Sequence, residues 1–164
     1  MHFFNKNKSV DGGVAMGLSE REKGLVSLLE SKTKAAFLQA LEQMDKEGIA
    51  YYISETKRDL TTQLLYALNG RLGDIPFSEL QWAWAQIGKA PPPNNLKQTW
   101  TLQSNHFNGT AVDMVPYDAV KKAPLWDAVN KRMVEIMKSN GFDWGGDWGK
   151  DKYDPPHWEL KKVA

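Results

Sequence analysis

The order in which helical and strand patterns follow one another restricts the fold of this 164-residue chain more than any other feature. Ser19 and Glu22 have the spacing of a capping box, so a helix is expected to begin there. Apolar residues at helical spacing continue to Gly48, either in one long helix or in two helices that separate near residues 31–33. The β-branched and aromatic stretch over residues 49–54 predicts a short strand.

The remaining patterns mix both kinds of element. Helices are predicted over residues 59–69, 77–87 and 125–140, strands over 100–103 and 110–115, and short extended pieces over 142–160. Because these elements do not alternate as regular strand–helix–strand units, we expect an α+β fold with a small antiparallel sheet flanked by helices.

Composition excludes several functions. The 21 Lys and Arg residues nearly balance the 20 Asp and Glu residues, which argues against a nucleic-acid partner bound through a basic surface. No stretch reaches the roughly 18–20 apolar residues that span a bilayer, so we expect no membrane insertion. The chain has no cysteine, which excludes disulfides, thiol nucleophiles and zinc sites built on thiolates.

The first residues predict an arm rather than a signal. The Gly-rich stretch Ser9–Gly17 lacks the apolar core of about 7–15 residues that a secretory signal needs. We therefore expect a loosely docked arm over residues 1–18, a single domain over 19–164, and synthesis in the cytoplasm without a signal peptide.

Two of the three histidines have the neighbours that a metal site needs. His106 precedes Asp113 by a short segment that contains Gly109, and His157 follows in the tail. Two imidazoles and one carboxylate form a common ligand set for catalytic zinc, with one position left for water. Bound zinc lowers the pKa of that water to about 7, and a nearby carboxylate is then needed to take and return protons.

Asp154 is a candidate for that carboxylate. Asp154 and Pro155 each precede a proline, which favours extended or polyproline II backbone. A three-residue repeat would then bring Asp154 and His157 to the same side of the chain. Residue types alone leave a second interpretation open, in which the histidines are ordinary surface or core residues and Asp154-Pro155-Pro156 is an ordinary turn.

Two longer motifs carry a resemblance to a known family. The first is Ser104-x-His106-x-x-Gly109-x-Ala111-x-Asp113, and the second is Trp144-Gly145-Gly146-Asp147-Trp148 followed by Asp154-x-x-His157-Trp158-Glu159. Together they resemble the zinc peptidases that act on bacterial cell-wall peptides, which include D-alanyl-D-alanine carboxypeptidases, vancomycin-resistance dipeptidases and phage L-alanyl-D-glutamate endolysins. A weaker third match consists of Arg58, Gln63, Gly70 and Arg71.

The resemblance implies a role for each matched residue. His106, Asp113 and His157 would be the zinc ligands, and Asp154 would be the catalytic acidic residue. Arg58 would hold the substrate and stabilise the developing oxyanion, which suits a fixed cation. The resemblance also implies the zinc-peptidase fold that these enzymes share with the hedgehog signalling domain.

For two groups of side chains, the sequence leaves more than one role open. Ser104 would position the substrate or support the first ligand, and Glu159 would be either an outer-shell partner of the metal site or a structural residue. For the tryptophans, we expect Trp82, Trp84 and Trp100 to pack an additional helix onto the core, with a substrate cleft or lid as the alternative, and Trp144 and Trp148 to be structural.

The resemblance also implies a function. We expect a monomeric zinc peptidase of the endolysin type, made in the host cytoplasm, that cuts the L-alanyl-D-glutamate bond of peptidoglycan stem peptides in the cell wall. The alternative enzyme is a D-alanyl-D-alanine carboxypeptidase or dipeptidase with the same residues. A third hypothesis is a non-catalytic zinc-binding or wall-binding module, which the presence of Asp154 and Arg58 disfavours.

Overall fold

The computed structural model describes residues 17–162 apart from 72, 91–93, 97–98 and 100. Its helices are α1 (Glu20–Ser27), α2 (Ser31–Lys46), α3 (Leu60–Leu68), α4 (Phe77–Gln86), α5 (Asn105–Asn108) and α6 (Lys131–Ser139). Its strands are β1 (Tyr51–Glu55), β2 (Ala111–Asp118), β3 (Ala123–Pro124), β4 (Phe142–Trp144) and β5 (His157–Leu160). Two short 3₁₀ helices, η1 (Gly145–Asp147) and η2 (Lys150–Lys152), connect β4 to β5.

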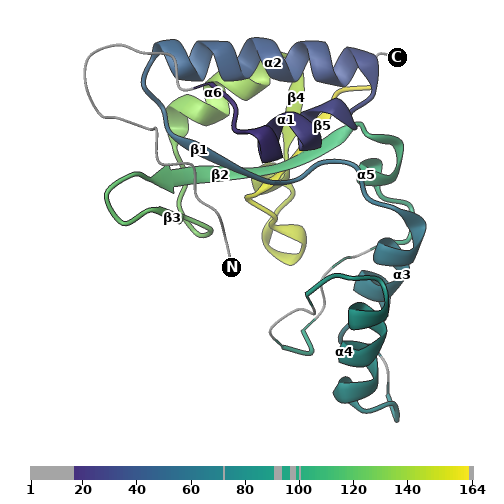
Figure 1. The fold of residues 1–164 in the computed structure, drawn as a ribbon. Helices are drawn as coiled ribbons and strands as arrows, with labels where there is room; N and C mark the ends of the chain where they lie inside the picture. The colour runs from purple at the N-terminus through teal and green to yellow at the C-terminus, as the bar shows by residue number, and fades with distance from the viewer. Residues whose placement is uncertain (1–16, 72, 91–93, 97–98, 100, 163–164) are drawn as a thin grey trace.

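The sheet is antiparallel throughout and follows the order β1-β2-β5-β4, with β3 paired to β2. Helices α1, α2 and α6 lie on one side of it, whereas α3 and α4 project away from the sheet (Figure 1). This arrangement confirms the predicted α+β class. No helix in the described part of the chain has both the length and the apolar character that crossing a membrane requires.

The main core lies between the sheet and the helices that cover it. Its fully buried side chains come from α2, α6 and the strands, and include Phe37, Met44, Ile53, Met114 and Phe142. Phe37 and Phe142 meet edge to face with ring centroids 6.1 Å apart, which ties α2 to β4. The apolar spacing read from the sequence in α2 therefore marks the face that covers the sheet.

The helical segment after Ser19 is broken into two helices. The predicted capping box is present, with Ser19 N donating to Glu22 Oε2 at 2.9 Å and Glu22 N donating to Ser19 Oγ at 3.3 Å. Helix α1 ends at Ser27, and Glu30 then caps α2 by accepting from the backbone of Lys32 and Thr33. Between the two helices, Glu30 N donates to the carbonyl of Gly109 at 3.0 Å. This hydrogen bond connects the break between α1 and α2 to the end of α5.

A small second core fixes the projecting helices to each other. Leu65 of α3 packs with Leu80 and Trp84 of α4, and the Trp84 ring meets the Tyr66 ring edge to face at 4.9 Å. Trp84 therefore packs α4 against α3 in this second core and not onto the main core as expected, and Trp82 is 62% exposed. Trp100 lies outside the described residues.

Three local predictions are wrong. Helix α6 begins only at Lys131, because Asn130 caps it and Leu125 instead donates its N–H to Pro116 O at 2.9 Å beside the β2–β3 pair. Residues 101–103 form no strand. The tail at Asp154 is a turn and not polyproline II, because His157 N donates to Asp154 O at 3.1 Å.

The domain division is not decided by the structure. The arm predicted over residues 1–18 lies outside the described residues except for Gly17 and Leu18, and Leu18 packs against the main core. The arm and the single domain over residues 19–164 therefore stay predictions.

Candidate metal centre and active site

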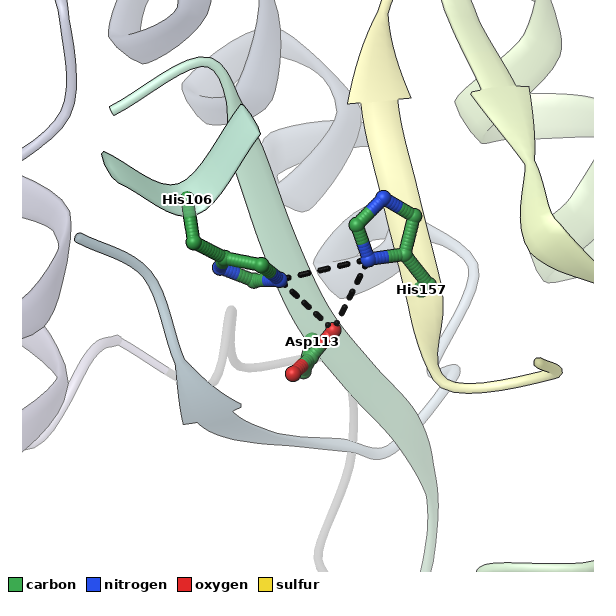
Figure 2. Close-up of side chains that lie close together, drawn as sticks. All are labelled: His106, Asp113 and His157. Atoms are coloured by element: carbon green, nitrogen blue, oxygen red, sulfur yellow. Dashed lines mark hydrogen bonds and ion pairs between the residues drawn. The ribbon is translucent and has the colours of Figure 1, made fainter. Parts of the chain in front are cut away.

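Helix α5 and strands β2 and β5 bring three donor atoms together (Figure 2). His106 Nε2 lies 3.1 Å from Asp113 Oδ1 and 3.2 Å from His157 Nδ1. His157 Nδ1 lies 3.3 Å from Asp113 Oδ1. A tetrahedral zinc ion with bonds of about 2.0–2.1 Å separates its ligands by about 3.3–3.4 Å. The three atoms therefore have the spacing that zinc needs.

The outer contacts of both histidines leave the facing ring nitrogens free to bind a metal. The second ring nitrogen of His106, Nδ1, lies 2.5 Å from the carbonyl oxygen of Thr56, and because a carbonyl only accepts, Nδ1 carries the proton. His157 Nε2 likewise lies 3.2 Å from the Glu159 carboxylate, which also accepts a hydrogen bond from Asn105 Nδ2 at 2.6 Å. Such outer partners orient metal-binding imidazoles in known sites, so the residues present fit a zinc ion.

Strand register and a short capped helix produce this arrangement. Asp113 of β2 pairs directly with His157 of β5, so both side chains project from the same face of the sheet. Ser104 caps α5 by accepting from His106 N at 3.3 Å, and Gly109 ends that helix in the left-handed region at φ 71°. A Cβ at Gly109 would also lie 3.0 Å from Glu30 N. Gly109 thus ends a short helix that presents His106.

Gly145 allows the turn before His157 to approach the strand end closely. The carbonyl of Gly145 accepts from Asp154 N at 3.2 Å. A Cβ on Gly145 would lie 2.3 Å from Asp154 O and 3.1 Å from the Cβ of His157. Gly145 therefore permits a close backbone approach directly behind two of the candidate site residues.

Replacing Gly145 with alanine should lower the free energy of unfolding by about 1–3 kcal/mol, because the added methyl must displace the backbone of Asp154. Thermal denaturation measures this change. Gly24→Ala is the matched control: a Cβ there meets nothing within 4 Å in α1, and a helical alanine should stabilise by about 0.5–1 kcal/mol. Equal melting temperatures for the two variants would contradict the prediction.

Asp154 faces the same cavity as the three donors but is not one of them. Its backbone is held at both ends of the turn, by Gly145 O and by His157 N. Burial raises the pKa of its carboxyl, and the charge of Asp113 adds to this effect, although the two histidines oppose it. A raised pKa brings a carboxyl group closer to the neutral range in which general acid–base catalysis is most effective.

Asp113 and His157, two of the three donors, strongly influence each other's pKa. Burial disfavours the charged form of Asp113, but the charge and hydrogen bonds of His106 and His157 outweigh it and lower the pKa of the carboxyl well below its usual range. Burial would lower the pKa of His157, but hydrogen bonds to Asp113 and Glu159 raise it to about 9. The cluster thus keeps Asp113 ionised, as a metal ligand must be.

Arg58 reaches the cluster from the loop that follows β1. Its side chain is 9% exposed, and Nη2 lies 3.8 Å from Asp113 Oδ2. Its backbone N–H donates to His106 O at 3.1 Å, which joins this loop to α5. Arg58, the first residue of the weaker third motif, is therefore brought to the site through contacts of both its backbone and its side chain.

One cavity of about 1120 Å³ contains every predicted site residue. It is lined by all six: Arg58, Ser104, His106, Asp113, Asp154 and His157. Trp144 stacks on Trp158 with centroids 5.7 Å apart and donates from Nε1 to Pro155 O at 2.8 Å, as expected for a structural residue.

Sequence reasoning missed other parts of the cavity wall. Trp148, interpreted above as structural, lines the cavity with its ring 4.9 Å from the His157 ring. Glu55, Tyr66 and Lys152 also line it. The Thr56 contact uses a backbone carbonyl, for which side-chain patterns carry no signal.

Comparisons with known proteins agree with this geometry. A sequence model of the family described as D-alanyl-D-alanine carboxypeptidase matches residues 97–160, the segment that holds all three donors and Asp154. The L-alanyl-D-glutamate peptidase of Listeria phage A118 is 30% identical over 139 residues, which is 82% of this chain and 39% of that protein. The chain thus spans about two fifths of the length of this curated relative.

One solved structure shows the same fold, and a second aligns less closely. The L-Ala D-Glu endopeptidase ChiX of Serratia marcescens aligns with a TM-score of 0.53 at 19% identity, covering 88% of this chain and 89% of its own. The vancomycin-resistance D,D-pentapeptidase VanY, solved with Zn(II), aligns with a TM-score of 0.44 at 12% identity, covering 80% of this chain and 72% of its own.

Proposed function

We propose that this chain, whose residues 97–160 match the family described as D-alanyl-D-alanine carboxypeptidase, is a zinc-dependent peptidase that hydrolyses the L-alanyl-D-glutamate bond of peptidoglycan stem peptides. The observation that carries the proposal is the group of His106, Asp113 and His157 at zinc-ligand spacing, with Asp154 on the wall of the same cavity. The 30% identity to a phage L-alanyl-D-glutamate peptidase supports the choice of bond.

His106, Asp113 and His157 would hold the ion through Nε2, Oδ1 and Nδ1. Zinc supplies a Lewis acid there, which polarises a carbonyl and makes water more acidic. The Thr56 carbonyl and the Glu159 carboxylate would keep the two imidazoles in the required tautomers and orientations. Ser104 would act through the backbone of His106 by capping α5.

Asp154 would carry the proton during hydrolysis. Its carboxylate would accept a proton from the attacking water and return it to the nitrogen of the scissile amide as the C–N bond breaks. The products are a new carboxylate on the alanine side and a free amine on the glutamate side, so the atoms of one water molecule are consumed. The raised pKa of the Asp154 carboxyl suits both steps.

Arg58 and Lys152 would bind the substrate. Arg58 presents N–H groups beside Asp113, where the oxygen of the scissile carbonyl gains negative charge. Lys152 lines the cavity, and none of the ion pairs found among the described residues involves its ammonium group. The ammonium group of Lys152 is therefore available to bind a carboxylate of the substrate. In the proposed substrate, the D-glutamyl residue on the leaving side of the bond carries such a carboxylate.

Product analysis with and without a chelator tests the proposed function. Purified cell walls digested by the protein should give fragments with a new amino terminus on D-glutamate, and chelation should stop their formation because the three donors then hold no metal. Mass spectrometry of the muropeptides identifies the bond. Adding zinc back should restore the products. Digestion that continues unchanged in excess chelator would contradict a metal-dependent mechanism.

The same product analysis also tests the second candidate function. The description of the matched family favours a D-alanyl-D-alanine carboxypeptidase, which would use the same donors and the same Asp154. Loss of the terminal D-alanine would then replace the new D-glutamate amino terminus. Zinc binding without any change in the cell wall would instead indicate a non-catalytic module. An action on peptidoglycan after synthesis in the host cytoplasm, and a monomeric state, remain part of the proposal.

A further inference from the structure

An irregularity in β1 turns Glu55 toward the candidate site. Ile53 pairs with Met114, but the next pair joins Glu55 to Asp113, so β1 has one more residue than β2 at this point. The additional residue is Ser54, whose hydroxyl donates to Asp113 O at 3.1 Å. A β-bulge of this kind changes the direction in which the following side chain points. Ile53 therefore stays in the core, while Glu55 joins Asp113 on the cavity wall.

Glu55 is the principal partner of Arg58. Arg58 Nε donates to Glu55 Oε2 at 3.0 Å, and Nη2 contacts the same oxygen. The two side chains are only 9% and 20% exposed, so water screens this ion pair weakly. Because Glu55 supplies a full negative charge at this distance, it neutralises much of the field that Arg58 would otherwise direct into the cavity.

Two further contacts complete the support of the guanidinium group. Arg58 Nη1 donates to Gln63 Oε1 at 2.7 Å, and Gln63 Nε2 in turn donates to Thr101 O at 2.6 Å. The Tyr66 ring lies 4.5 Å from Arg58 Cζ. Glu55 and Gln63 thus use three of the five N–H groups of the guanidinium fork, which leaves two for a substrate.

We propose that Glu55 is a positioning residue that holds Arg58 in one orientation and offsets its charge, so that Arg58 donates to the neutral scissile carbonyl and does not capture a carboxylate. This inference rests on the proposed function. A fixed and neutralised guanidinium suits an internal amide bond, because the oxygen that it must stabilise becomes negative only during the reaction. The carboxylate of the substrate is left to Lys152, on another part of the cavity wall.

The test measures kcat and KM on a defined muropeptide for wild type, Glu55→Gln, Arg58→Ala and the double variant. Glu55→Gln should lower kcat on the order of tenfold to a hundredfold, since a misplaced group of this kind can cost about 10²-fold, with little change in KM. In the Arg58→Ala background, Glu55→Gln should cost nothing more, because its effect passes through the arginine.

The matched control is Glu47→Gln. Glu47 also pairs with an arginine, Arg132, at 2.7 Å, but it lies outside the cavity, so this variant should keep the wild-type kcat. A purely structural role of Glu55 would instead lower kcat by the same factor with and without Arg58, and that result would overturn the proposal.

Two further measurements keep the test decisive. If Glu55→Gln does not fold, Glu55→Asp serves in its place: it retains the charge but withdraws the carboxylate by one methylene, and a wild-type kcat would overturn the proposal. Wild-type protein without activity on the muropeptide would refute the proposed function itself. An active wild type with a fully active Glu55→Gln variant would refute only the role of Glu55.

Discussion

Replacing Asp154 with asparagine should reduce peptide release from purified cell walls by about 10²- to 10⁴-fold, the usual contribution of a general acid–base group. The amide has the same shape but cannot accept the proton of the attacking water. Zinc content and melting temperature should stay at wild-type values, since the three donors do not include Asp154 and its backbone contacts to Gly145 and His157 are unaffected.

Asp143→Asn is the control for this experiment. Asp143 lies on β4, where its half-exposed side chain is 3.7 Å from Lys161 Nζ and outside the cavity. This variant undergoes the same chemical change and should retain full activity. If Asp154→Asn releases peptides as fast as Asp143→Asn does, Asp154 is not the proton carrier.

Replacing His106 with alanine should abolish both zinc binding and wall digestion. One of three protein ligands is then lost, so zinc affinity should fall by more than the roughly 10- to 100-fold that the loss of an outer-shell partner costs. Metal analysis after dialysis measures the bound zinc, and peptide release measures activity. Asp113→Asn, which preserves side-chain size on β2, provides the same test with less disturbance of the core.

The Glu159→Gln variant should have a zinc affinity between those of the wild type and of His106→Ala. Glu159 contacts the far side of the His157 ring at 3.2 Å and is not among the three donors, so its loss should weaken zinc binding only by roughly 10- to 100-fold. Zinc affinity should therefore decrease from wild type to Glu159→Gln to His106→Ala. A His106→Ala protein that binds zinc as tightly as Glu159→Gln would contradict the assignment of His106 as a ligand.

Two of the three failed local predictions concern backbone groups that bond to another segment of the chain. The helical spacing of Leu125 and Val129 is real, but the N–H of Leu125 bonds to Pro116 beside the sheet and α6 begins later. The carbonyl of Thr101 accepts from the Gln63 side chain, and residues 101–103 pair with no strand. At Asp154, a hydrogen bond across the two prolines replaces the polyproline II geometry.

Asp154 and His157 nevertheless line the same cavity, although not for the predicted reason. A polyproline II repeat would put the two residues on the same side of the chain but about 9 Å apart along it, whereas the observed turn brings their backbones within hydrogen-bond distance. The position of Gly145 behind this turn completes it, because any larger residue would collide with Asp154 O.

The candidate ligands could be named from the sequence because the two motifs that contain them resemble those of a zinc peptidase family, and because their chemistry is carried by the side chains themselves. His106 and Asp113 lie seven residues apart around Gly109, so local geometry suffices to bring them near each other. The contacts around these ligands depend instead on pairs of residues that lie far apart in the sequence. Thr56 meets His106, and Glu55 meets Asp113, only because β1 lies against β2 with one bulged residue, a register that no local spacing encodes.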